Sequence, residues 1–493
     1  MKKFGFALLI LLILLNLLIL SCAAILFACA GNSNSNKPEA EIQNPADVNS
    51  PAAEETAAPA PVIPVQDMNG KEFRIITAGW WDYEPMEVHD ICPEEYMGEP
   101  LNDAAYDRKI RIEETYNCKI VQTAGSYEPS DDVKKVQKSV QAGDHVYDAA
   151  MMRGIDFTTL LTKNYLLELG ELQNIDFDNS WWRKKCSDAL LIGGKRYGVS
   201  GNISSVEISL AALVCFNKNM IKGYGLDSPY DLVKTGDWTL GKFAEMGKQV
   251  AHDLDGDGKM TENDIWGVNY DRDRVWNLLN SSGVKLIELD SNGYPQITID
   301  AGENLYKIQT VFTALFDESY SSNNRRIGSA FNQERTLFRL GWALDVVGLR
   351  EYDFDFGIVP LPKYDLNQKE YMPNVYGLGA NIICVPSTNA DMENTGLFLE
   401  AFSYEGEKSV IPVYYENLLK TKSARDNESE DMIDYIFGNL YYDTGTLLNF
   451  DGFTQRICEM AETQDTNIAS FVDKNKAKCE KAIKKIMDTI EAG

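Results

Sequence analysis

Short apolar segments alternate with amphipathic segments from residue 73 onward, and this alternation limits the folds open to the chain. The first strand candidates are residues 73–77, 118–122 and 146–152. Residues 101–117 between them read as a helix. A second helix has Val133, Val136 and Val140 on one face and starts after Ser130, a suitable N-cap. Strands separated by helices predict an α/β fold, with a parallel, right-handed sheet covered by helices.

The same alternation continues to the end of the chain. Its 493 residues suffice for about three domain-sized units or two large lobes. Further strand candidates are residues 210–216, 336–341, 356–360 and 380–385. Thr239 is placed to cap a helix that buries Leu240, Phe243 and Val250, and further helices are expected near 393–402 and over 469–490.

The first 28 residues resemble an export signal. Lys2 and Lys3 precede an almost uninterrupted apolar run over residues 4–28. A run of this length fits either a secretory signal peptide or a retained membrane helix. The sequence Leu-Phe-Ala-Cys at 26–29 resembles a bacterial lipobox, in which the cysteine is lipidated and becomes the new N-terminus. We therefore interpret residues 1–28 as a signal peptide and Cys29 as the lipidation site.

Cys22 is the rival lipidation site. Cleavage there would leave the apolar residues 23–28 on the mature chain, so we favour Cys29. Residues 29–66 then form a disordered tether, since residues 30–66 contain no aromatic residue and hold six of the 17 prolines. Either site places the body outside the cytoplasm, and we expect it at the outer face of the cytoplasmic membrane, held there by lipid.

Composition excludes several functions. The net charge of −27 argues against a nucleic-acid partner. Three histidines and no phosphate-binding glycine loop leave little basis for histidine-based catalysis or nucleotide handling. The seven cysteines after Cys29 are scattered and never spaced as CxxC, so neither a zinc site nor a disulfide framework is expected.

Residues 253–264 (DLDGDGKMTEND) have the spacing of a calcium-binding loop. Oxygen ligands would come from Asp253, Asp255, Asp257, the Lys259 carbonyl and Asp264, with Gly258 at the sharp turn. The loop departs from the usual pattern because Asp rather than Glu closes it, as in the dockerin-type loops that it resembles. The alternative is an acidic surface turn without metal. We predict a structural Ca²⁺ that braces the chain after the helix capped by Thr239.

Several blocks together resemble the bacterial extracellular solute-binding proteins of family 1, the ligand-capturing lipoproteins of ABC importers. No single block is decisive, but their order and spacing match over about residues 70–455. The blocks are residues 101–108 (LNDAAYDR), 215–220 (CFNKNM), 225–239, the calcium loop with 265–267, 356–363 (FGIVPLPK) and 413–432.

This resemblance implies a two-lobe periplasmic-binding-protein-like fold of type II, with hinge strands joining the lobes and a ligand cleft between them. The N-terminal lobe would comprise residues 70–208 plus 376–425. The C-terminal lobe would comprise 209–375 plus 426–493 and carry the calcium loop. Residues 210–216 would form the first crossing between the lobes.

Ligands of open α/β sheets bind outside the carboxyl ends of the strands, so residues that follow strand candidates are the binding candidates. Two further choices are Tyr376, beside the proposed return crossing, and Trp276, because family members often present an aromatic residue in that region. For Trp276 and Trp342, an equally good alternative is that they are core residues. For Arg153, the alternative is an ion pair with a structural acid. The predicted ligand-binding set is Trp80, Trp81, Asp82, Arg153, Trp276, Trp342, Asp345 and Tyr376.

Flat aromatic rings together with carboxylates and guanidiniums suit a carbohydrate. We expect a monomeric, non-enzymatic solute-binding protein that captures a carbohydrate or oligosaccharide and delivers it to the permease subunits of an ABC importer. Peptides and polyamines are alternative ligands. The competing functions are an exported, calcium-braced glycoside hydrolase, which needs two carboxylates across a cleft, and a surface sugar sensor or adhesin.

Overall fold

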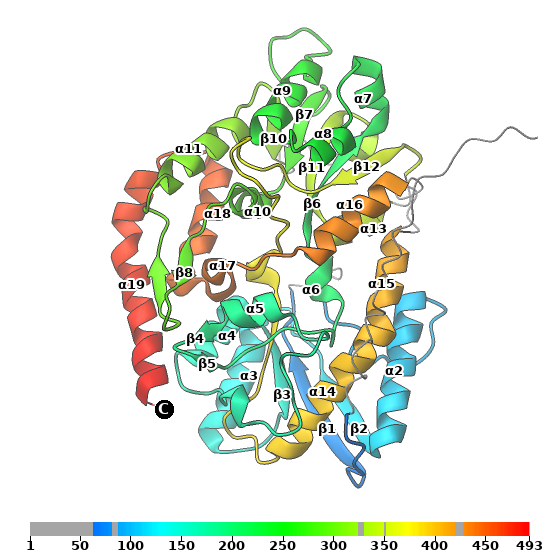
Figure 1. The fold of residues 1–493 in the computed structure, drawn as a ribbon, viewed down its shortest axis with the longest axis vertical. Helices are drawn as coiled ribbons and strands as arrows, with labels where there is room; N and C mark the ends of the chain where they lie inside the picture. Colours follow the sequence, from blue (N-terminus) through cyan, green and yellow to red (C-terminus); the bar gives the residue numbers. More distant parts are fainter. Residues whose placement is uncertain (1–62, 81–86, 324–329, 350–351, 420–426, 493) are drawn as a thin grey trace, which may run out of the picture. The chain divides into compact units, whose positions relative to one another are not determined.

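The computed structural model describes residues 63–80, 87–323, 330–349, 352–419 and 427–492, and residues 61–493 form one compact unit (Figure 1). The signal peptide, Cys29, the tether up to residue 62, Trp81 and Asp82 lie outside the described residues. Within the described ranges, no helix combines the length and the apolar content that crossing a bilayer requires.

The first sheet has four strands in the order β13-β3-β1-β2. Strand β1 pairs in parallel with β2 and β3, and β13 runs antiparallel to β3. All four strands fall within the predicted N-terminal lobe. They are β1 (Lys71–Thr77), β2 (Cys118–Thr123), β3 (Ala149–Arg153) and β13 (Asn381–Cys384).

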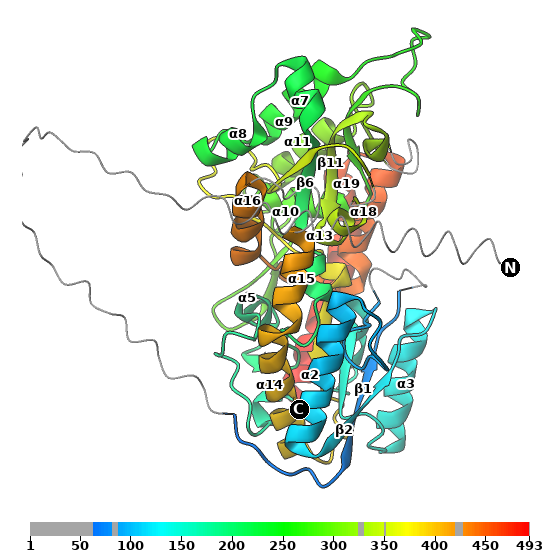
Figure 2. The same cartoon turned by 90° about the vertical axis from the view of Figure 1, so that its right-hand side faces the viewer.

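Side chains alternate across this sheet and bury both of its faces. Phe73 and Ile75 of β1 pack toward α2 and α14, and the rings of Phe73 and Phe398 stack with their centroids 3.6 Å apart. Ile76 faces the opposite way, toward α3 and α4. Figure 2 shows the sheet between these two helix layers. The covering helices are α2 (Pro100–Tyr116), α3 (Pro129–Ala142), α4 (Gly154–Leu161) and α14 (Met392–Lys408).

The second sheet has five strands in the order β10-β7-β11-β6-β12. Strands β7, β10 and β11 are mutually parallel, and β6 runs antiparallel to β11 and β12. All five strands fall within the predicted C-terminal lobe. They are β6 (Ala212–Asn217), β7 (Trp266–Tyr270), β10 (Ser321–Asn323), β11 (Thr336–Trp342) and β12 (Phe356–Val359).

The helices around the second sheet follow from local sequence signals. Thr239 caps α9 as predicted, because its hydroxyl accepts the amide of Lys242, and Leu240, Phe243 and Val250 are buried. Glycines in the left-handed conformation follow α7 and α8. The helices are α7 (Lys218–Tyr224), α8 (Pro229–Thr235), α9 (Leu240–Val250), α10 (Arg274–Ser281), α11 (Asn304–Leu315), α13 (Ala343–Gly348) and α16 (Asn427–Gly438).

Three segments cross between the lobes side by side. Tyr376 donates its amide to the Leu210 carbonyl, and Ala212 donates to the Asn374 carbonyl. Tyr441 donates its amide to the Pro373 carbonyl. The first crossing therefore includes the short helix α6 (Val206–Ser209) and residues 210–211, and β6 already belongs to the second sheet.

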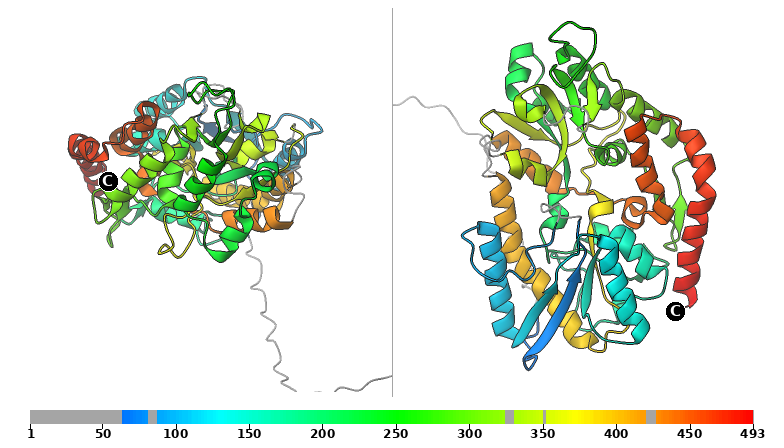
Figure 3. Two further views of the ribbon diagram at one scale, coloured as in Figure 1. Left: turned by 90° about the horizontal axis from the view of Figure 1, so that it is seen from above. Right: turned by 180° about the vertical axis from the view of Figure 1, so that it is seen from behind.

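The C-terminal part of the chain contacts both lobes. Thr158 of α4 donates its hydroxyl to the Leu448 carbonyl, and Lys195 donates to the Ile490 carbonyl. Figure 3 shows the long last helix running along the side of the unit. These elements are α15 (Val410–Leu419), α17 (Thr444–Leu448), α18 (Phe453–Thr463) and α19 (Ile468–Ala492), where Cys479, Ile483, Ile486 and Ile490 are buried as predicted.

Small elements complete the described structure. The hairpin of β4 and β5 approaches that of β8 and β9, and Gly193 donates its amide to the Gly293 carbonyl. The remaining elements are α5 (Lys184–Ala189), β4 (Leu191–Ile192), β5 (Lys195–Arg196), β8 (Ile287–Leu289), β9 (Pro295–Ile297) and the 3₁₀ turns Leu169–Glu171, Phe331–Gln333, Gly377–Gly379 and Phe450–Gly452.

Three sequence expectations need correction. Both sheets are mixed rather than parallel, because β13 and β6 run against their neighbours. Ser130 does not cap α3: Glu128 occupies the N-cap position and Pro129 starts the helix. Strand β3 begins at Ala149, since Asp148 turns its side chain into a polar cluster.

The seven cysteines among the described residues are free, and six of them are buried.

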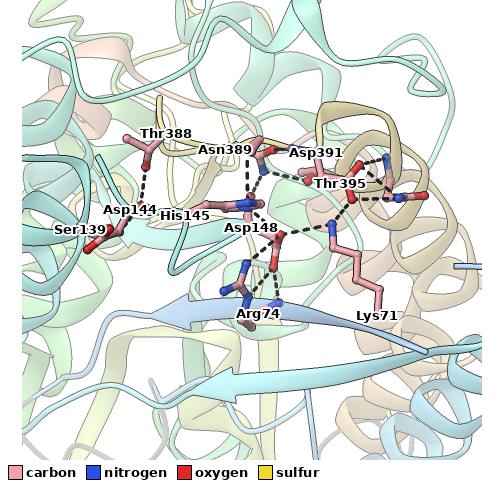
Figure 4. Close-up of polar contacts among 12 residues, drawn as sticks. Lys71, Arg74, Ser139, Asp144, His145, Asp148, Thr388, Asn389, Asp391 and Thr395 are labelled. Carbon is pink, nitrogen blue, oxygen red and sulfur yellow. Dashed lines mark hydrogen bonds and ion pairs between the residues drawn. The ribbon is translucent and has the colours of Figure 1, made fainter. Parts of the chain in front are cut away.

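The polar cluster around Asp148 lies at the amino end of the first sheet (Figure 4). The Asp148 side chain has no exposed surface and accepts hydrogen bonds from the amide and Nε of Arg74, at 2.8 and 3.1 Å. Nε2 of His145 lies 2.8 Å from Asp148, and Nζ of Lys71 lies 3.7 Å away. Lys71 also bonds Asp391, which caps α14. The cluster joins the starts of β1, β3 and α14, at the end of β3 opposite Arg153.

Candidate ligand-binding site

A cavity of about 550 Å³ lies between the two lobes, within the usual size range of small-molecule sites. The first lobe, the hinge and the second lobe all contribute to its walls. The lining residues are Trp80, Arg153, Ile155, Asp271, Arg272, Asp273, Arg274, Asn323, Trp342, Tyr376, Leu378, Asn449, Gln455 and Glu462.

Most of these residues stand at the carboxyl ends of strands. Trp80 follows β1, and Arg153, Asn323 and Trp342 are the last residues of β3, β10 and β11. The turn 271–274 follows β7 directly. Parallel strands bring these ends to one edge of each sheet, and in both lobes that edge faces the pocket.

The first lobe contributes an aromatic ring and a guanidinium. The Arg153 guanidinium lies 5.2 Å from the ring centroid of Trp80. Its Nε donates to Asp156 Oδ2 at 2.7 Å, and both side chains are 7% exposed. Burial raises the pKa of Asp156 despite the opposing charge of Arg153. Asp156 thereby fixes Arg153 beside Trp80.

The second lobe and the hinge contribute a stack of three groups. The Arg274 guanidinium lies 3.3 Å from the ring centroid of Trp342, and the ring of Tyr376 stacks on Trp342 at 4.5 Å and 26°. Two planar groups this close cannot share one face of an indole, so we infer that they cover opposite faces. Trp342 is accordingly only 3% exposed, and its Nε1 donates to Asn277 Oδ1 at 3.0 Å.

Asp345 fixes the positions of Arg274 and Trp342 in this stack. Its carboxylate accepts Nη2 of Arg274 and Nη2 of Arg339, both at 3.0 Å, and the amide of Trp342 at 2.7 Å. Burial alone would raise the pKa of Asp345, but the two guanidiniums outweigh it and hold the pKa below its usual value. Asp345 is therefore ionised and acts on the pocket through Arg274.

A second ion-pair group lines the pocket at the turn after β7. Arg272 Nη1 donates to Glu462 Oε1 of α18 at 2.8 Å, and its Nε lies 3.4 Å from Asp273. Burial raises the pKa of Asp273 against the pull of Arg272 and Arg274. Arg274 also lies 3.6 Å from Asp271. Carboxylates therefore flank both arginines of the turn.

The structure brings four of the eight predicted ligand-binding residues together: Trp80, Arg153, Trp342 and Tyr376 line the pocket. Trp276 and Asp345 do not line it. Trp276 lies on the buried face of α10 with no exposed surface, which matches its alternative reading as a core residue. Trp81 and Asp82 fall outside the described residues. Ligand contact itself stays a prediction for all eight.

Sequence reasoning missed several lining residues. The residues 271–274 and Asn323 follow strands and satisfy the same strand-end rule, but strand β10 has only three residues and gives no pattern. Ile155 and Leu378 were also missed, and so were Asn449, Gln455 and Glu462, which come from the C-terminal helical region. No strand precedes the last three, so only the tertiary structure reveals them.

The calcium loop has the geometry that its spacing predicts at three positions. Carboxylate oxygens of Asp253, Asp255 and Asp257 lie within 4.8 Å of one another. Gly256 and Gly258 have φ of +73° and +81°, and their amides donate to Asp253 at 2.8 Å. These hydrogen bonds lower the pKa of Asp253. Three clustered carboxylates fit a hard cation.

Asp264 has a different place in the loop. It is fully buried, and its carboxylate accepts the amides of Leu254 and Thr261 at 2.8 and 2.6 Å. In this arrangement Asp264 closes the loop through backbone contacts. The loop itself connects α9 to β7, and its ends pair through His252 and Ile265.

The pocket offers both donors and acceptors of hydrogen bonds. Its guanidiniums donate and its carboxylates accept hydrogen bonds in fixed directions, and Trp80 offers an aromatic face. Such an arrangement recognises a solute with several hydroxyl groups and apolar ring faces.

Two lobes, three crossing segments and a pocket between the lobes define the two-lobe fold of solute-binding proteins. No family model and no curated protein sequence matches the chain. An ABC substrate-binding protein from Listeria monocytogenes, solved in complex with cycloalternan, matches with a TM-score of 0.54 and 14% identity. The match covers 86% of this chain and 99% of that one.

Two further solved structures share the fold. A cyclo/maltodextrin-binding protein complexed with maltotetraose has a TM-score of 0.52 and 14% identity, over 86% of this chain and 97% of that one. An ABC transporter solute-binding protein from Thermotoga lettingae, bound with α-D-tagatose, has a TM-score of 0.50 and 14% identity, over 85% and 100%. The chain therefore has the two-lobe fold of the maltose-binding type, and the fold expectation is confirmed.

Proposed function

We propose that the protein captures a carbohydrate between its lobes. The observation that carries this proposal is the pocket, where Trp80 stands beside hydrogen-bonding arginines, carboxylates and amides at the carboxyl ends of strands. The likeness in fold to proteins solved with cycloalternan, maltotetraose and tagatose supports the same ligand class. Hinge closure would then bury the sugar.

The second part of the proposal is delivery to an ABC permease by a monomer that is lipid-anchored through Cys29. The lipobox, the proline-rich tether and the fold support this part. In this arrangement the tether lets the lobes reach the permease while lipid holds the chain at the outer face of the membrane. Deleting the gene should abolish uptake of the bound sugar, and a Cys29→Ala variant should leave the membrane fraction.

The third part is a structural Ca²⁺ in the loop 253–264. Asp253, Asp255 and Asp257 would hold the ion, with the Lys259 carbonyl as a further ligand. Asp264 would contribute only if its carboxylate turned away from Leu254 and Thr261. The ion would neutralise carboxylates that repel one another and would fix the path from α9 into β7.

A binding experiment tests the proposed function. Thermal unfolding of the full-length protein is followed with a panel of mono- and oligosaccharides, peptides and polyamines. A ligand at 100 times its Kd stabilises the folded state by about 2.7 kcal/mol, which gives a readable shift. A shift with a sugar and no turnover supports the proposal. A shift confined to peptides or polyamines overturns the ligand class, and hydrolysis of a glycoside overturns the non-enzymatic role.

A further inference from the structure

Every arginine of the pocket is paired with a carboxylate. Each of the three arginines among its described lining residues has a carboxylate within 3.0 Å: Arg153 has Asp156, Arg272 has Glu462 and Arg274 has Asp345. Two lie close to a second carboxylate, Asp273 for Arg272 and Asp271 for Arg274. Five carboxylates thus surround three arginines, and no positive charge is left in excess at these arginines.

Glu462 differs from the other two principal partners. Asp156 and Asp345 are 7% exposed and lie behind the pocket wall, where they hold arginines in place. Glu462 is 29% exposed, lines the pocket itself and belongs to α18, an element without any other charged lining residue. Arg272 is 36% exposed, so a ligand can reach it.

We propose that this pocket rejects anionic solutes, and that Glu462 is the specificity-determining residue that withdraws Arg272 from anion recognition. This inference rests on the proposed function and excludes uronic acids from its ligand class. A carboxylate on the ligand would have to displace Glu462 from Arg272.

Two contributions to the binding free energy oppose an anionic ligand. Entering the pocket removes its hydration, and a charge that finds only paired partners cannot recover that loss. Removing either partner of an existing pair leaves the other charge uncompensated in a partly buried place. Neutral hydroxyls avoid both contributions, since they can donate to the carboxylates and accept from the arginines without breaking the pairs.

The first experiment uses three forms of each test sugar with the full-length protein. Maltotriose, cellotriose and galactotriose are compared with derivatives in which one C6 hydroxymethyl is oxidised to a carboxylate or replaced by an aminomethyl group. Calorimetric titration should give a Kd for the carboxylate form at least about tenfold weaker than for the neutral parent, and the aminomethyl form controls for the change at C6. A carboxylate derivative that binds as tightly as its parent overturns the inference.

The outcomes separate this inference from the proposed function. Binding of the uronate form alone overturns the rejection of anions but leaves a carbohydrate binder. If no form of these sugars binds, and none of the wider carbohydrate panel, the proposed function fails and the inference fails with it.

The second experiment tests Glu462. The variant Glu462→Gln keeps the shape of the side chain and removes the closer of the two carboxylates beside Arg272, so the preference for the neutral over the C6-carboxylate sugar should fall at least about tenfold. The matched control is Glu405→Gln, which removes the carboxylate partner of Arg111, 2.6 Å away and outside the pocket lining. It should leave that preference unchanged within about twofold.

A double variant keeps the test decisive. If Arg272 causes the tighter binding of the carboxylate sugar in Glu462→Gln, this gain in affinity should disappear when Glu462→Gln is combined with Arg272→Gln. The carboxylate sugar should then again bind weakly. The gain in Glu462→Gln should also shrink as salt rises, because it is electrostatic. An unchanged preference in Glu462→Gln, or a gain that survives loss of Arg272, overturns the assigned role of Glu462.

Discussion

Trp80 and Trp342 both stand at strand ends beside the pocket, but their rings have different surroundings. Trp342 lies between Arg274 and Tyr376, which leaves it 3% exposed. Trp80 is only partly buried and lines the pocket next to Arg153. At the scale of single residues, we therefore propose Trp80 as the stacking platform for a sugar.

Replacing Trp80 should weaken sugar binding more than it weakens the fold. Loss of a central aromatic contact costs about 2 kcal/mol, so Trp80→Ala should raise the Kd about thirtyfold in calorimetric titration. The control Tyr224→Ala removes an aromatic side chain that is 48% exposed on α7, outside the pocket lining, and should leave the Kd unchanged. An unchanged Kd in Trp80→Ala would refute the assigned platform.

Glu207, at the crossing between the lobes, makes the free energy of unfolding depend on pH. It is buried on α6 and its Oε1 accepts the Tyr442 hydroxyl at 2.5 Å. Burial raises the pKa of Glu207 to about 7, against the opposing effects of Arg183 and Tyr442. Between pH 4.5 and 7 the folded state therefore binds more protons than the unfolded state, so the stabilising contribution of this group is lost as pH rises through 7.

The variant Glu207→Gln cannot ionise and should remove that loss. Relative to the wild type, its free energy of unfolding should rise by about 2–3 kcal/mol between pH 5 and pH 8. Denaturant titrations at several pH values measure the difference. Glu405→Gln serves as the control variant and is measured at the same pH values. A constant difference for Glu207→Gln would show that the carboxyl group titrates normally.

At the scale of elements, periodicity located most of the structure. Strands β1, β2, β6, β11, β12 and β13 and the helices α2, α9, α14 and α19 lie within a few residues of their predicted ranges. Strand direction was not accessible in this way, because an alternating pattern is the same for a parallel and an antiparallel neighbour. The mixed sheets result from pairings between distant residues, such as Ile382 with Met152.

The calcium loop is the element whose proposed role is simplest to test. Adding Ca²⁺ should raise the unfolding temperature of the wild-type protein, and a chelator should reverse the rise. Asp257→Asn removes one of three clustered carboxylates and should abolish most of this response. Asp290→Asn is the control, since Asp290 also accepts amides in an exposed turn but lies outside the cluster. A wild-type protein that does not respond to Ca²⁺ contradicts the metal site.

At the scale of the whole molecule, the C-terminal region joins the two lobes and completes the pocket. Sequence reasoning assigned residues 426–493 to the second lobe as a block, and α16 does pack on β12 there. Helix α17, in contrast, packs on α4 of the first lobe. Its backbone comes so close that a Cβ on Gly154 would lie 1.8 Å from the Leu447 carbonyl oxygen. Contacts between residues almost 300 positions apart leave no pattern in a local stretch of sequence.

This close approach predicts the effect of one methyl group. Gly154→Ala should push α17 away from α4 and lower the free energy of unfolding by about 2–3 kcal/mol. It should also weaken ligand binding, because Arg153 and Asn449 line the pocket on either side of the contact. Gly223→Ala is the control: a Cβ there meets nothing within 4 Å, and the variant should be up to about 1 kcal/mol more stable. Chemical denaturation measures the change in the free energy of unfolding, and calorimetric titration measures the change in Kd.

The strand order of the first sheet also has a consequence for synthesis. Strand β3 has β13 as its neighbour on one side, and 231 residues separate Arg153 from Cys384. At about 5–20 residues per second, the ribosome needs on the order of ten to fifty seconds to make that stretch. Throughout this interval one edge of β3 has no partner strand, and open edges invite pairing with other chains. A newly made chain therefore exposes this open strand edge until β13 has been made, and only then can its first lobe close.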